Sequence, residues 1–439
     1  MRLLNKIPLI QKYKQKLNEK FQAIGKEMTA LASENIALRI RLKILEGKKI
    51  TVVFVCWRPS VWGSLKTVYE ALKADSFFDV KIVTIPNKKQ LPELGFSHEI
   101  YESEGAEDFW HGSDVLAGYN YETGEWLNIR SLKADYICFQ RPYDICRTDT
   151  QKSWIVSQYA KIFYVAYYAF FSCNETNFVN DECTPLGFMQ NVSLFFTQND
   201  ADQAYMQKRM EEAGNTNVKV VMTGFPRYDA LPKAYDAAQT AWNFKYDHSR
   251  FRLIWTPRWD TSEHNCHFFD YKDKLIDYCK DNDDIDFVFR PHPQAFLNWA
   301  ASGEFPESEA ERFKTIYAQS ANMTIDTSGE FLPTFYTADC MISDTSSVVP
   351  EFFLTGNPII YCHKKGSINS FAKDKGYTSG FYWAENWSDV VKLLDMLRSG
   401  KDPLRTVRQE LIKKYFYIPE QGAGNAIKEY IKQDAFGNL

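Results

Sequence analysis

Apolar residues recur every seven positions along the first 46 residues, which predicts one long helix. Asn35 stands in the companion row of a positions, and a buried Asn there fixes register and strand number in parallel coiled coils. We therefore expect residues 1–48 to be a helix that forms a coiled coil and joins copies of the chain into a homo-oligomer through residues 1–46. The d positions are Ile10, Leu17, Ile24, Leu31, Leu38 and Leu45.

Two other interpretations of this helix stay open. A second apolar row (Ile36, Ile40 and Ile44) would suit a helix that packs on its own globular domain. A lysine-rich flank would suit a helix that lies on an anionic membrane surface. That flank consists of Lys6, Lys12, Lys14, Lys16 and Lys20.

From residue 49 onward, short apolar runs alternate with helical spacers, a pattern typical of parallel α/β sheets. A polar stretch at 236–250 interrupts the alternation and predicts a linker. We expect two doubly wound, Rossmann-like domains at 49–235 and 251–420 that face each other across a cleft. A last helix, within 421–439, could cross back over the first domain.

The stretch from Asp339 to Tyr361 has the pattern of a buried strand, a polar turn, a helix at 348–355 and a second strand. The turn holds hydroxyl residues (Thr345, Ser346 and Ser347), a residue type that caps free N–H groups at the start of helices. In an open parallel sheet such a turn lies at the carboxyl ends of the strands, where ligands bind. The segment predicts an anion site, although a capped helix alone gives the same pattern.

Two further predicted strands end in cationic side chains. One runs into Arg258, and the other, 286–289, runs into Arg290 and then His292, which stands between two prolines. Because these strand ends should meet at one edge of the sheet, the three side chains could hold a diphosphate. A tight turn with an exposed Arg and a structural His is the alternative. Glu351, one turn into the helix, could hold ribose or substrate hydroxyls, or face solvent.

These segments together resemble the CDP-glycerol glycerophosphotransferase family, the teichoic-acid-type polymerases and primases, over about residues 190–439. The resemblance is carried by TGFPRYD (223–229), WTPRW (255–259), FRPHP (289–293) and ISDTSSVVPEFFLTGNPIIY (342–361). It implies a GT-B-like fold that binds a CDP-alcohol in the C-terminal domain. It also implies attack by an acceptor hydroxyl on the phosphorus next to glycerol, with CMP as the leaving group and no metal cofactor.

The resemblance implies three groups of site residues. The donor diphosphate would be held by Arg258, Arg290, His292, Thr345, Ser346 and Ser347, with His292 also catalytic. The donor alcohol or ribose would meet Asp344 and Glu351. The acceptor side would include Arg141, Tyr143 and Arg227.

The sequence departs from the family where a His-Gly segment of the N-terminal domain is thought to supply the general base. The corresponding strand, 161–170, ends in tyrosines and holds no His. Asp144 and His264 are the remaining candidates for the proton acceptor, although an exposed turn Asp is the commoner explanation of Asp144. His264, Cys266 and His267 could also be metal ligands, but such a short group without a partner cluster is a weak metal signal.

Charge and cysteine content limit the partners and the cellular compartment that we expect. Residues 1–49 hold 12 Lys and Arg against 4 Asp and Glu, whereas the remainder holds 40 against 52, so we expect no nucleic-acid partner. The nine scattered cysteines, no signal peptide and no membrane-spanning run predict a cytoplasmic protein, with the basic arm able to meet the inner face of a membrane.

Three functions follow for test. The first is a transferase that moves a glycerol-phosphate or similar polyol-phosphate unit from a CDP-alcohol to a hydroxyl of a surface glycopolymer or lipid-linked acceptor. The second is a GT-B glycosyltransferase that uses a nucleotide-sugar, since the same residues suit any nucleotide diphosphate. The third is a non-catalytic coiled-coil scaffold with a degenerate nucleotide fold.

Overall fold

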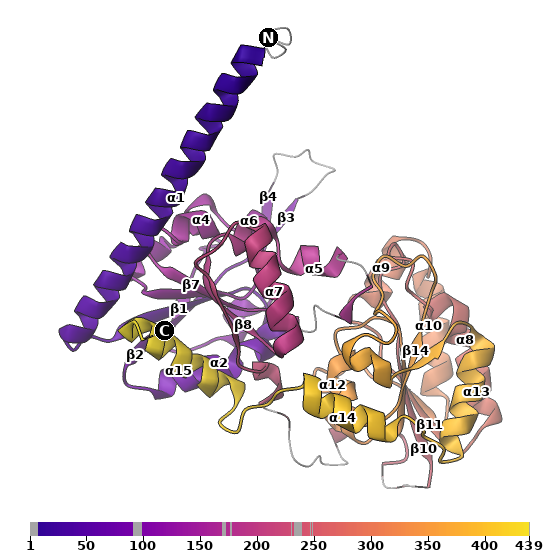
Figure 1. Ribbon diagram of the computed structural model, residues 1–439. Coiled ribbons are helices and arrows are strands. Elements are labelled where there is room, and N and C mark those ends of the chain that lie inside the picture. Colours follow the sequence, from indigo (N-terminus) through magenta and orange to yellow (C-terminus); the bar gives the residue numbers. More distant parts are fainter. Residues whose placement is uncertain are drawn as a thin grey trace.

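The computed structural model of the chain describes residues 8–90, 99–168, 173–175, 178–229, 231, 239–245, 247 and 249–438. Within them the chain forms two α/β domains that lie beside each other, with a long helix at the N-terminal end (Figure 1). The predicted fold, two doubly wound Rossmann-like domains preceded by a long helix, is confirmed.

The first domain is built on a seven-stranded parallel sheet with the order β5-β2-β1-β6-β7-β8-β9. The strands are β1 Ile50–Cys56, β2 Phe78–Thr84, β5 Val115–Ala117, β6 Tyr136–Phe139, β7 Lys161–Val165, β8 Val192–Thr197 and β9 Lys219–Met222. Every residue of β1 is buried, as expected for a central parallel strand that is covered on both faces. An antiparallel ribbon, β3 (Asn87–Gln90) and β4 (Glu99–Glu102), lies beside the sheet.

Short helices connect these strands. They are α2 Lys66–Ala74, α3 Ala106–Phe109, α4 Ser153–Val156, α5 Phe178–Cys183, α6 Leu186–Met189 and α7 Asp200–Glu212.

The second domain is built on a six-stranded parallel sheet with the order β12-β11-β10-β13-β14-β15. The strands are β10 Phe251–Thr256, β11 Ile285–Phe289, β12 Met323–Ile325, β13 Cys340–Ser343, β14 Ile359–Cys362 and β15 Tyr382–Ala384. The helices are α8 Phe268–Asp281, α9 Ala295–Ala301, α10 Glu307–Ala318, α11 Leu332–Tyr336, α12 Val349–Phe353, α13 Trp387–Arg398 and α14 Arg405–Tyr415.

The helix predicted at 348–355 is shorter than expected. Helix α12 spans only Val349–Phe353, its N-cap residue is Val348, and no side chain accepts a hydrogen bond from its free N–H groups. The chain leaves the helix at Leu354, and Gly356 takes a positive φ of 78° just after it. Ser346 and Ser347 are therefore turn residues and do not cap the helix.

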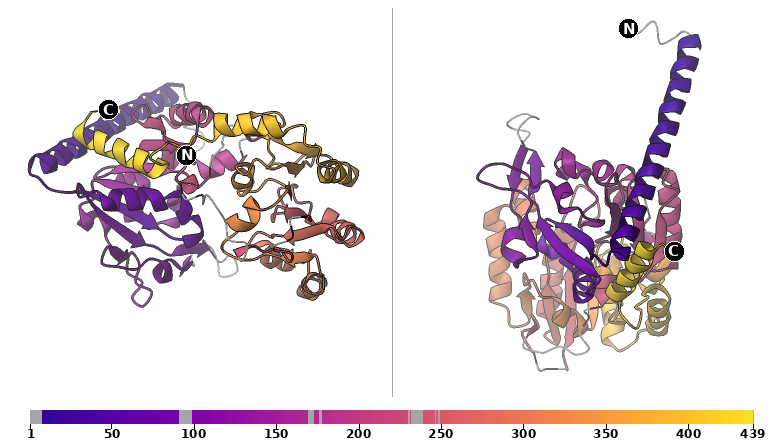
Figure 2. Two further views of the ribbon diagram at one scale, coloured as in Figure 1. Left: turned by 90° about the horizontal axis from the view of Figure 1, so that it is seen from below. Right: turned by 90° about the vertical axis from the view of Figure 1, so that its left-hand side faces the viewer.

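Helix α1 (Pro8–Leu45) is continuous, and its first turns project far from both sheets (Figures 1 and 2). Its end lies on the first domain, where Ile36 and Ile40 are buried and Ile44 packs beside them. Lys43 donates a hydrogen bond to Asp135 at 2.6 Å. The row expected for a helix on its own domain is thus occupied. Among the described residues, no helix is long and apolar enough to cross a membrane.

The last helix, α15 (Ala423–Phe436), returns to the first domain and packs against α2 and α1 (Figure 2). Asp229 receives hydrogen bonds from the N–H groups of Ala423 (2.7 Å) and Gly424 (2.8 Å) at its start. Asp434, near its end, accepts from Tyr136 and Lys161, both at 2.6 Å. The first domain is therefore covered by helices from both terminal parts of the described chain.

The predicted linker, 236–250, is described at 239–245, 247 and 249–250. Trp242 is buried, and its indole donates a hydrogen bond to Thr337 of the second domain at 2.8 Å. This described part of the linker packs on the second domain, which begins its sheet at Phe251.

Candidate functional site

Three neighbouring strands of the second domain end at the same edge. Strand β10 lies between β11 and β13 in parallel register, so Arg258, Arg290 and the turn after Ser343 follow one another along that edge. The structure thus brings together the three strand ends that were picked out in the sequence. The described site is an edge of side chains and turns, because α12 is too short to supply a strong dipole.

Asp344 ties two of these strand ends together. Its Oδ2 accepts hydrogen bonds from the N–H groups of Arg258 and His267, both at 3.0 Å, and its Oδ1 lies 2.7 Å from Nδ1 of His267. Asp344 is fully buried, so both oxygens face protein rather than a ligand. Its hydrogen bonds hold the backbone of Arg258 and His267 in place. They give no support to the predicted contact with the donor alcohol or ribose.

Each of the two arginines is held by a carboxylate. Arg258 donates from Nε to Glu263 at 2.8 Å and from one terminal nitrogen at 2.5 Å, which leaves its other terminal nitrogen for a ligand. Arg290 donates to Asp326 at 2.7 Å and to the carbonyl of Ser328 at 2.9 Å. These pairs fix both guanidinium groups in place before any anion arrives.

His292 lies over Trp259, with ring centroids 5.4 Å apart in a stacked arrangement. Its Nδ1 is 3.2 Å from the N–H of Gln294 and accepts that hydrogen bond, so the proton of the neutral ring belongs on Nε2. Burial lowers the pKa of His292 to about 4, and the charges of Arg258 and Arg58 act in the same direction. The imidazole is therefore neutral at pH 7 and offers an N–H donor from Nε2.

The hydroxyls of the turn differ in their availability. Thr345 is buried, and its hydroxyl is hydrogen-bonded to Tyr361 at 2.7 Å. Ser346 is half-buried and Ser347 is exposed, and neither hydroxyl has a hydrogen-bond partner in the part of the chain that the structure describes. Ser346 and Ser347 can therefore donate to an anion at no cost in existing bonds.

Glu351 is buried and forms an ion pair with Arg227 of the first domain, with Oε1 to Nε at 2.5 Å. Its other oxygen is buried without a partner among the described residues. Burial raises the pKa of Glu351, and the charge of Arg227 opposes that shift. The alternative of a solvent-facing Glu351 is wrong, because the side chain points into the protein between the two domains.

Phe331 was not predicted and lies in the same region. The guanidinium carbon of Arg290 is 4.8 Å from its ring centroid, and that of Arg227 is 6.0 Å away. The ring is only half-buried, so it offers an aromatic surface beside both domains. No short motif marks Phe331, because a lone Phe between a strand and a helix usually belongs to the core.

The first domain presents a basic edge of its own after β1 and β6. The guanidinium carbons of Arg58 and Arg141 lie 4.2 and 4.0 Å from the ring centroid of Trp57. Gln140 holds this turn, since its side-chain oxygen accepts from the N–H groups of Trp57 and Arg58 at 2.8 and 3.0 Å. The strand-end rule that picked out Arg258 and Arg290 would also have found Arg58, which directly follows the first strand.

Arg58 and Arg141 differ in charge pairing. Arg58 pairs with Glu104 at 2.9 Å, whereas Arg141 has no carboxylate partner among the described residues and donates to Asn87 at 2.8 Å. Burial lowers the pKa of Arg141 to about 10, which still leaves it charged at pH 7. Arg141 is thus a buried cation that makes no ion pair with a carboxylate among the described residues.

The candidates for the proton acceptor are placed differently from one another. Asp144 accepts from Arg147 (2.5 Å) and twice from Ser153 (2.8 and 2.5 Å), so its carboxylate is fully engaged in the turn. The Tyr143 hydroxyl is hydrogen-bonded to Tyr167, and burial raises the pKa of both. His264 is exposed, with a positive φ of 55°.

Glu182, at the end of α5, is a carboxylate that the sequence analysis did not pick out. Partial burial and the charge of Glu263, on the other domain, raise the pKa of Glu182, while Arg258 lowers it. The charges of two residues of the second domain thus act on Glu182, which belongs to the first. The described residues hold no group of three His, Cys, Asp or Glu side chains arranged as metal ligands.

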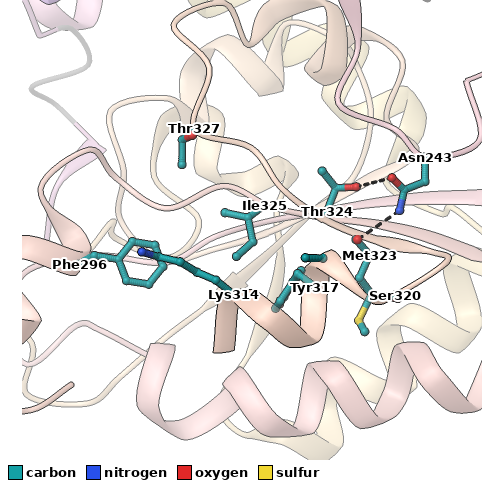
Figure 3. A pocket seen from close by; sticks show the side chains of 10 residues that line it. Asn243, Phe296, Lys314, Tyr317, Ser320, Met323, Thr324, Ile325 and Thr327 are labelled. Atoms are coloured by element: carbon teal, nitrogen blue, oxygen red, sulfur yellow. Dashed lines mark hydrogen bonds between the residues drawn. The ribbon is translucent and has the colours of Figure 1, made fainter. Parts of the chain in front are cut away.

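A separate pocket of about 610 Å³ lies at the outer edge of the second sheet, between α10 and β12 (Figure 3). Its lining includes Phe296, Lys314 and Tyr317, and Asn243 hydrogen-bonds along β12 through Thr324 (2.7 Å) and the carbonyl of Met323 (3.1 Å). None of the strand-end residues described above lines this pocket.

Comparison with known proteins gives one family match. Residues 195–393 match the family described as CDP-Glycerol:Poly(glycerophosphate) glycerophosphotransferase. This segment contains all three strand ends of the second domain. A comparison with curated proteins gives no match.

Several solved structures share the fold at low identity. MnaA of S. aureus, solved with UDP, is 12% identical with a TM-score of 0.59, over 89% of this chain and 98% of that one. The UDP-GlcNAc 2-epimerase of Neisseria meningitidis, bound to UDP-GlcNAc, is 14% identical with a TM-score of 0.54, over 89% and 100%. The wall teichoic acid polymerase TagF is 12% identical with a TM-score of 0.52, over 98% and 99%. These likenesses confirm the GT-B-like fold.

Proposed function

We propose a reaction for this chain from the match of residues 195–393 to the CDP-glycerol glycerophosphotransferase family. The protein moves a glycerol-phosphate or similar polyol-phosphate unit from a CDP-alcohol to a hydroxyl of a cell-surface glycopolymer or its lipid-linked precursor. The acceptor oxygen bonds to the phosphorus next to the polyol. The bond from that phosphorus to the bridging oxygen breaks, and CMP leaves with the electron pair.

The observation that carries this proposal is the set of donors gathered at three adjacent strand ends. Nε2 of His292 and the hydroxyls of Ser346 and Ser347 have no competing partners among the described residues, and the spare terminal nitrogen of Arg258 adds a cation. Donors fixed in advance stabilise the charge that develops on the departing phosphate. Arg290 and Thr345 hold this edge in shape.

The nucleoside of the donor belongs between Glu351 and Phe331. The buried, unpartnered oxygen of Glu351 could accept a hydrogen bond from a ribose hydroxyl, which would satisfy a group that is costly to leave unpaired. The half-buried ring of Phe331 offers a surface for the pyrimidine base.

The acceptor belongs on the basic edge of the first domain. Arg58 and Arg141 would attract a phosphate-rich acceptor, with Tyr143 beside them and Arg227 at the boundary of the two domains.

We expect the reaction to need no metal cofactor, which an assay in EDTA checks directly. The nine cysteines are free thiols, eight of them buried, which supports action in the reducing cytoplasm, with peripheral contact at the inner membrane face.

The first experiment measures binding of CDP-glycerol, CDP-ribitol, CMP and UDP-sugars to the purified chain, with nucleotide release followed in parallel. Selective binding of a CDP-alcohol with slow CMP release supports the proposal. Preference for a UDP-sugar would indicate a nucleotide-sugar transferase instead. Two proteins of similar fold were solved with UDP or UDP-GlcNAc bound. If no nucleotide binds, the non-catalytic coiled-coil scaffold becomes the best remaining function.

Variants then test the assigned donors. His292→Ala and the double change Ser346→Ala with Ser347→Ala should each lower kcat for CMP release by about 100-fold or more. Ser308→Ala, an exposed serine at the start of α10, is the matched control and should keep full activity. Normal turnover in His292→Ala and in the double serine variant would show that the site is wrongly assigned.

A further inference from the structure

Helix α1 carries two apolar rows, and the first domain covers only one of them. The covered row consists of Ile36, Ile40 and Ile44, which occupy the b, f and c positions of the seven-residue repeat. In a coiled coil these positions face outward, away from the partner helix. The chain's own domain therefore sits on the outer face of α1 and leaves the a and d positions free.

The a and d row is open to solvent wherever the side chains of α1 are described. Leu31 is 59% exposed, whereas Ile40 on the covered row is 1% exposed. Large apolar side chains aligned along a projecting helix are unusual on the surface of a monomer. The exposed row is Met28, Leu31, Asn35, Leu38, Leu42 and Leu45.

We propose that this row is the seam of a parallel, two-stranded coiled coil between two copies of the chain. In a parallel pair the two Asn35 side chains meet each other across the seam and can hydrogen-bond, whereas in an antiparallel pair each would face a d-position Leu. A buried Asn at an a position is itself a device that specifies strand number and register.

The charges beside the seam favour the same arrangement. In a parallel pair Glu34 at g lies opposite Arg39 at e of the second copy, and these two charges have opposite signs. Arg39 also lies 3.4 Å from Asp135 of its own first domain. The acidic Glu27 and Glu34, exposed beside the apolar row, would instead be repelled by an anionic membrane. The second copy is therefore the better occupant of this face.

The geometry also leaves room for both bodies. Because the first domain packs on the b, c and f side of α1, the bodies of the two copies would lie on the outer sides of the paired helices. The 38 residues of α1 give a rod of about 57 Å, and the repeat of apolar d positions extends through its sequence to Ile10.

Light scattering of the full-length protein tests the seam, and the wild type should have twice the chain mass of 51.0 kDa. The double variant Leu31→Glu with Leu38→Glu should have the mass of one chain, with an unchanged circular dichroism spectrum because both side chains are exposed. The control, Ala30→Glu with Ser33→Glu, adds the same charge at c and f positions and should stay dimeric.

Cross-linking tests the orientation. Leu38→Cys should form a disulfide between two copies on oxidation, because identical d positions meet in a parallel pair, whereas Ser33→Cys at f should not. A wild type with the mass of one chain, a trimer or tetramer, or a dimeric Leu31/Leu38 variant would overturn the proposal. Should a single-chain wild type instead bind phosphatidylglycerol vesicles and lose that binding in the Leu31/Leu38 variant, the membrane interpretation would replace it.

Discussion

At the scale of single residues, Arg258 and Arg290 differ from His292 in charge and in pairing. The arginines are paired with carboxylates, while the imidazole of His292 is neutral and stacked on Trp259. A neutral ring with its proton on Nε2 can donate to phosphate without a change of protonation. The charge of Arg258 contributes to keeping it neutral.

The first prediction concerns pH. The pKa of His292 is about 4 in the folded protein against about 6.5 when unfolded, so the unfolded chain binds the extra proton between these values. The contribution of His292 to stability is therefore present above pH 6.5 and is lost as the pH falls towards 4, by up to about 3 kcal/mol. Urea unfolding of wild type and His292→Ala across this range should show a steeper loss of stability in the wild type. Parallel curves would contradict it.

The second prediction concerns the ion pair between Arg227 and Glu351. Arg227→Ala should destabilise the protein by about 2–4 kcal/mol at pH 7, because it leaves a buried carboxylate without its cation. Without Arg227, burial raises the pKa of Glu351 further, so the folded state binds the proton first and the deficit relative to wild type shrinks at lower pH.

Thermal unfolding at pH 7.5 and 5 measures this deficit. The double variant Arg227→Ala with Glu351→Gln is the control, since it removes the buried charge and should be more stable at pH 7.5 than Arg227→Ala alone. A deficit that does not depend on pH would mean that Glu351 is not the responsible group.

At the scale of elements, α1 serves two purposes along its length, and truncation should separate them. Removal of residues 1–34 takes most of the proposed seam but keeps Ile36 and Ile40 in the core. We expect this variant to be folded and monomeric. Removal of residues 1–46 also uncovers the surface under Ile36, Ile40 and Ile44 and should cost a further 4–6 kcal/mol or so. Light scattering and urea unfolding of both truncations check this third prediction.

The central elements could be predicted from sequence because their signals are strong. Continuous runs rich in β-branched residues, such as 50–56, predict buried parallel strands. Arg258, Arg290 and Ser346 could be grouped because parallel strands end at one edge of the sheet. Three of the four edge strands of the two parallel sheets were missed. Strands β5, β12 and β15 have three residues each, too few for any periodicity, and they exist because a neighbouring strand offers hydrogen bonds.

The site was predictable only in part, because partners from distant segments decide what each side chain does. Asp344 was expected to face the donor, but its oxygens are occupied by Arg258 and His267, whose approach depends on the fold of the next loop. The sequence could not tell whether Glu351 is buried or exposed, because a helix of five residues is too short to show a periodic apolar face. Its burial follows from Arg227, which lies more than a hundred residues earlier and in the other domain.

At the scale of the whole molecule, the two domains influence each other's charges. Arg58 follows β1 of the first domain, yet its charge lowers the pKa of His292 in the second. The fourth prediction is that Arg58→Gln raises the pKa of His292 measured by NMR, while Lys66→Gln, an exposed change on α2, leaves it unchanged. An unaltered pKa in Arg58→Gln would mean that the two edges lie further apart in solution.

The return of α15 to the first domain has a consequence for how the protein is made. A ribosome delivers the chain from its N-terminal end, so β1 to β9 emerge long before the helix that covers α2 and supplies Asp434 to Tyr136. The second domain, continuous from Phe251 to Tyr415, can be completed first. The first domain must wait, open on one side, until α15 has also been synthesised. Its strands are therefore translated before those of the second domain, yet it is the domain that finishes folding last.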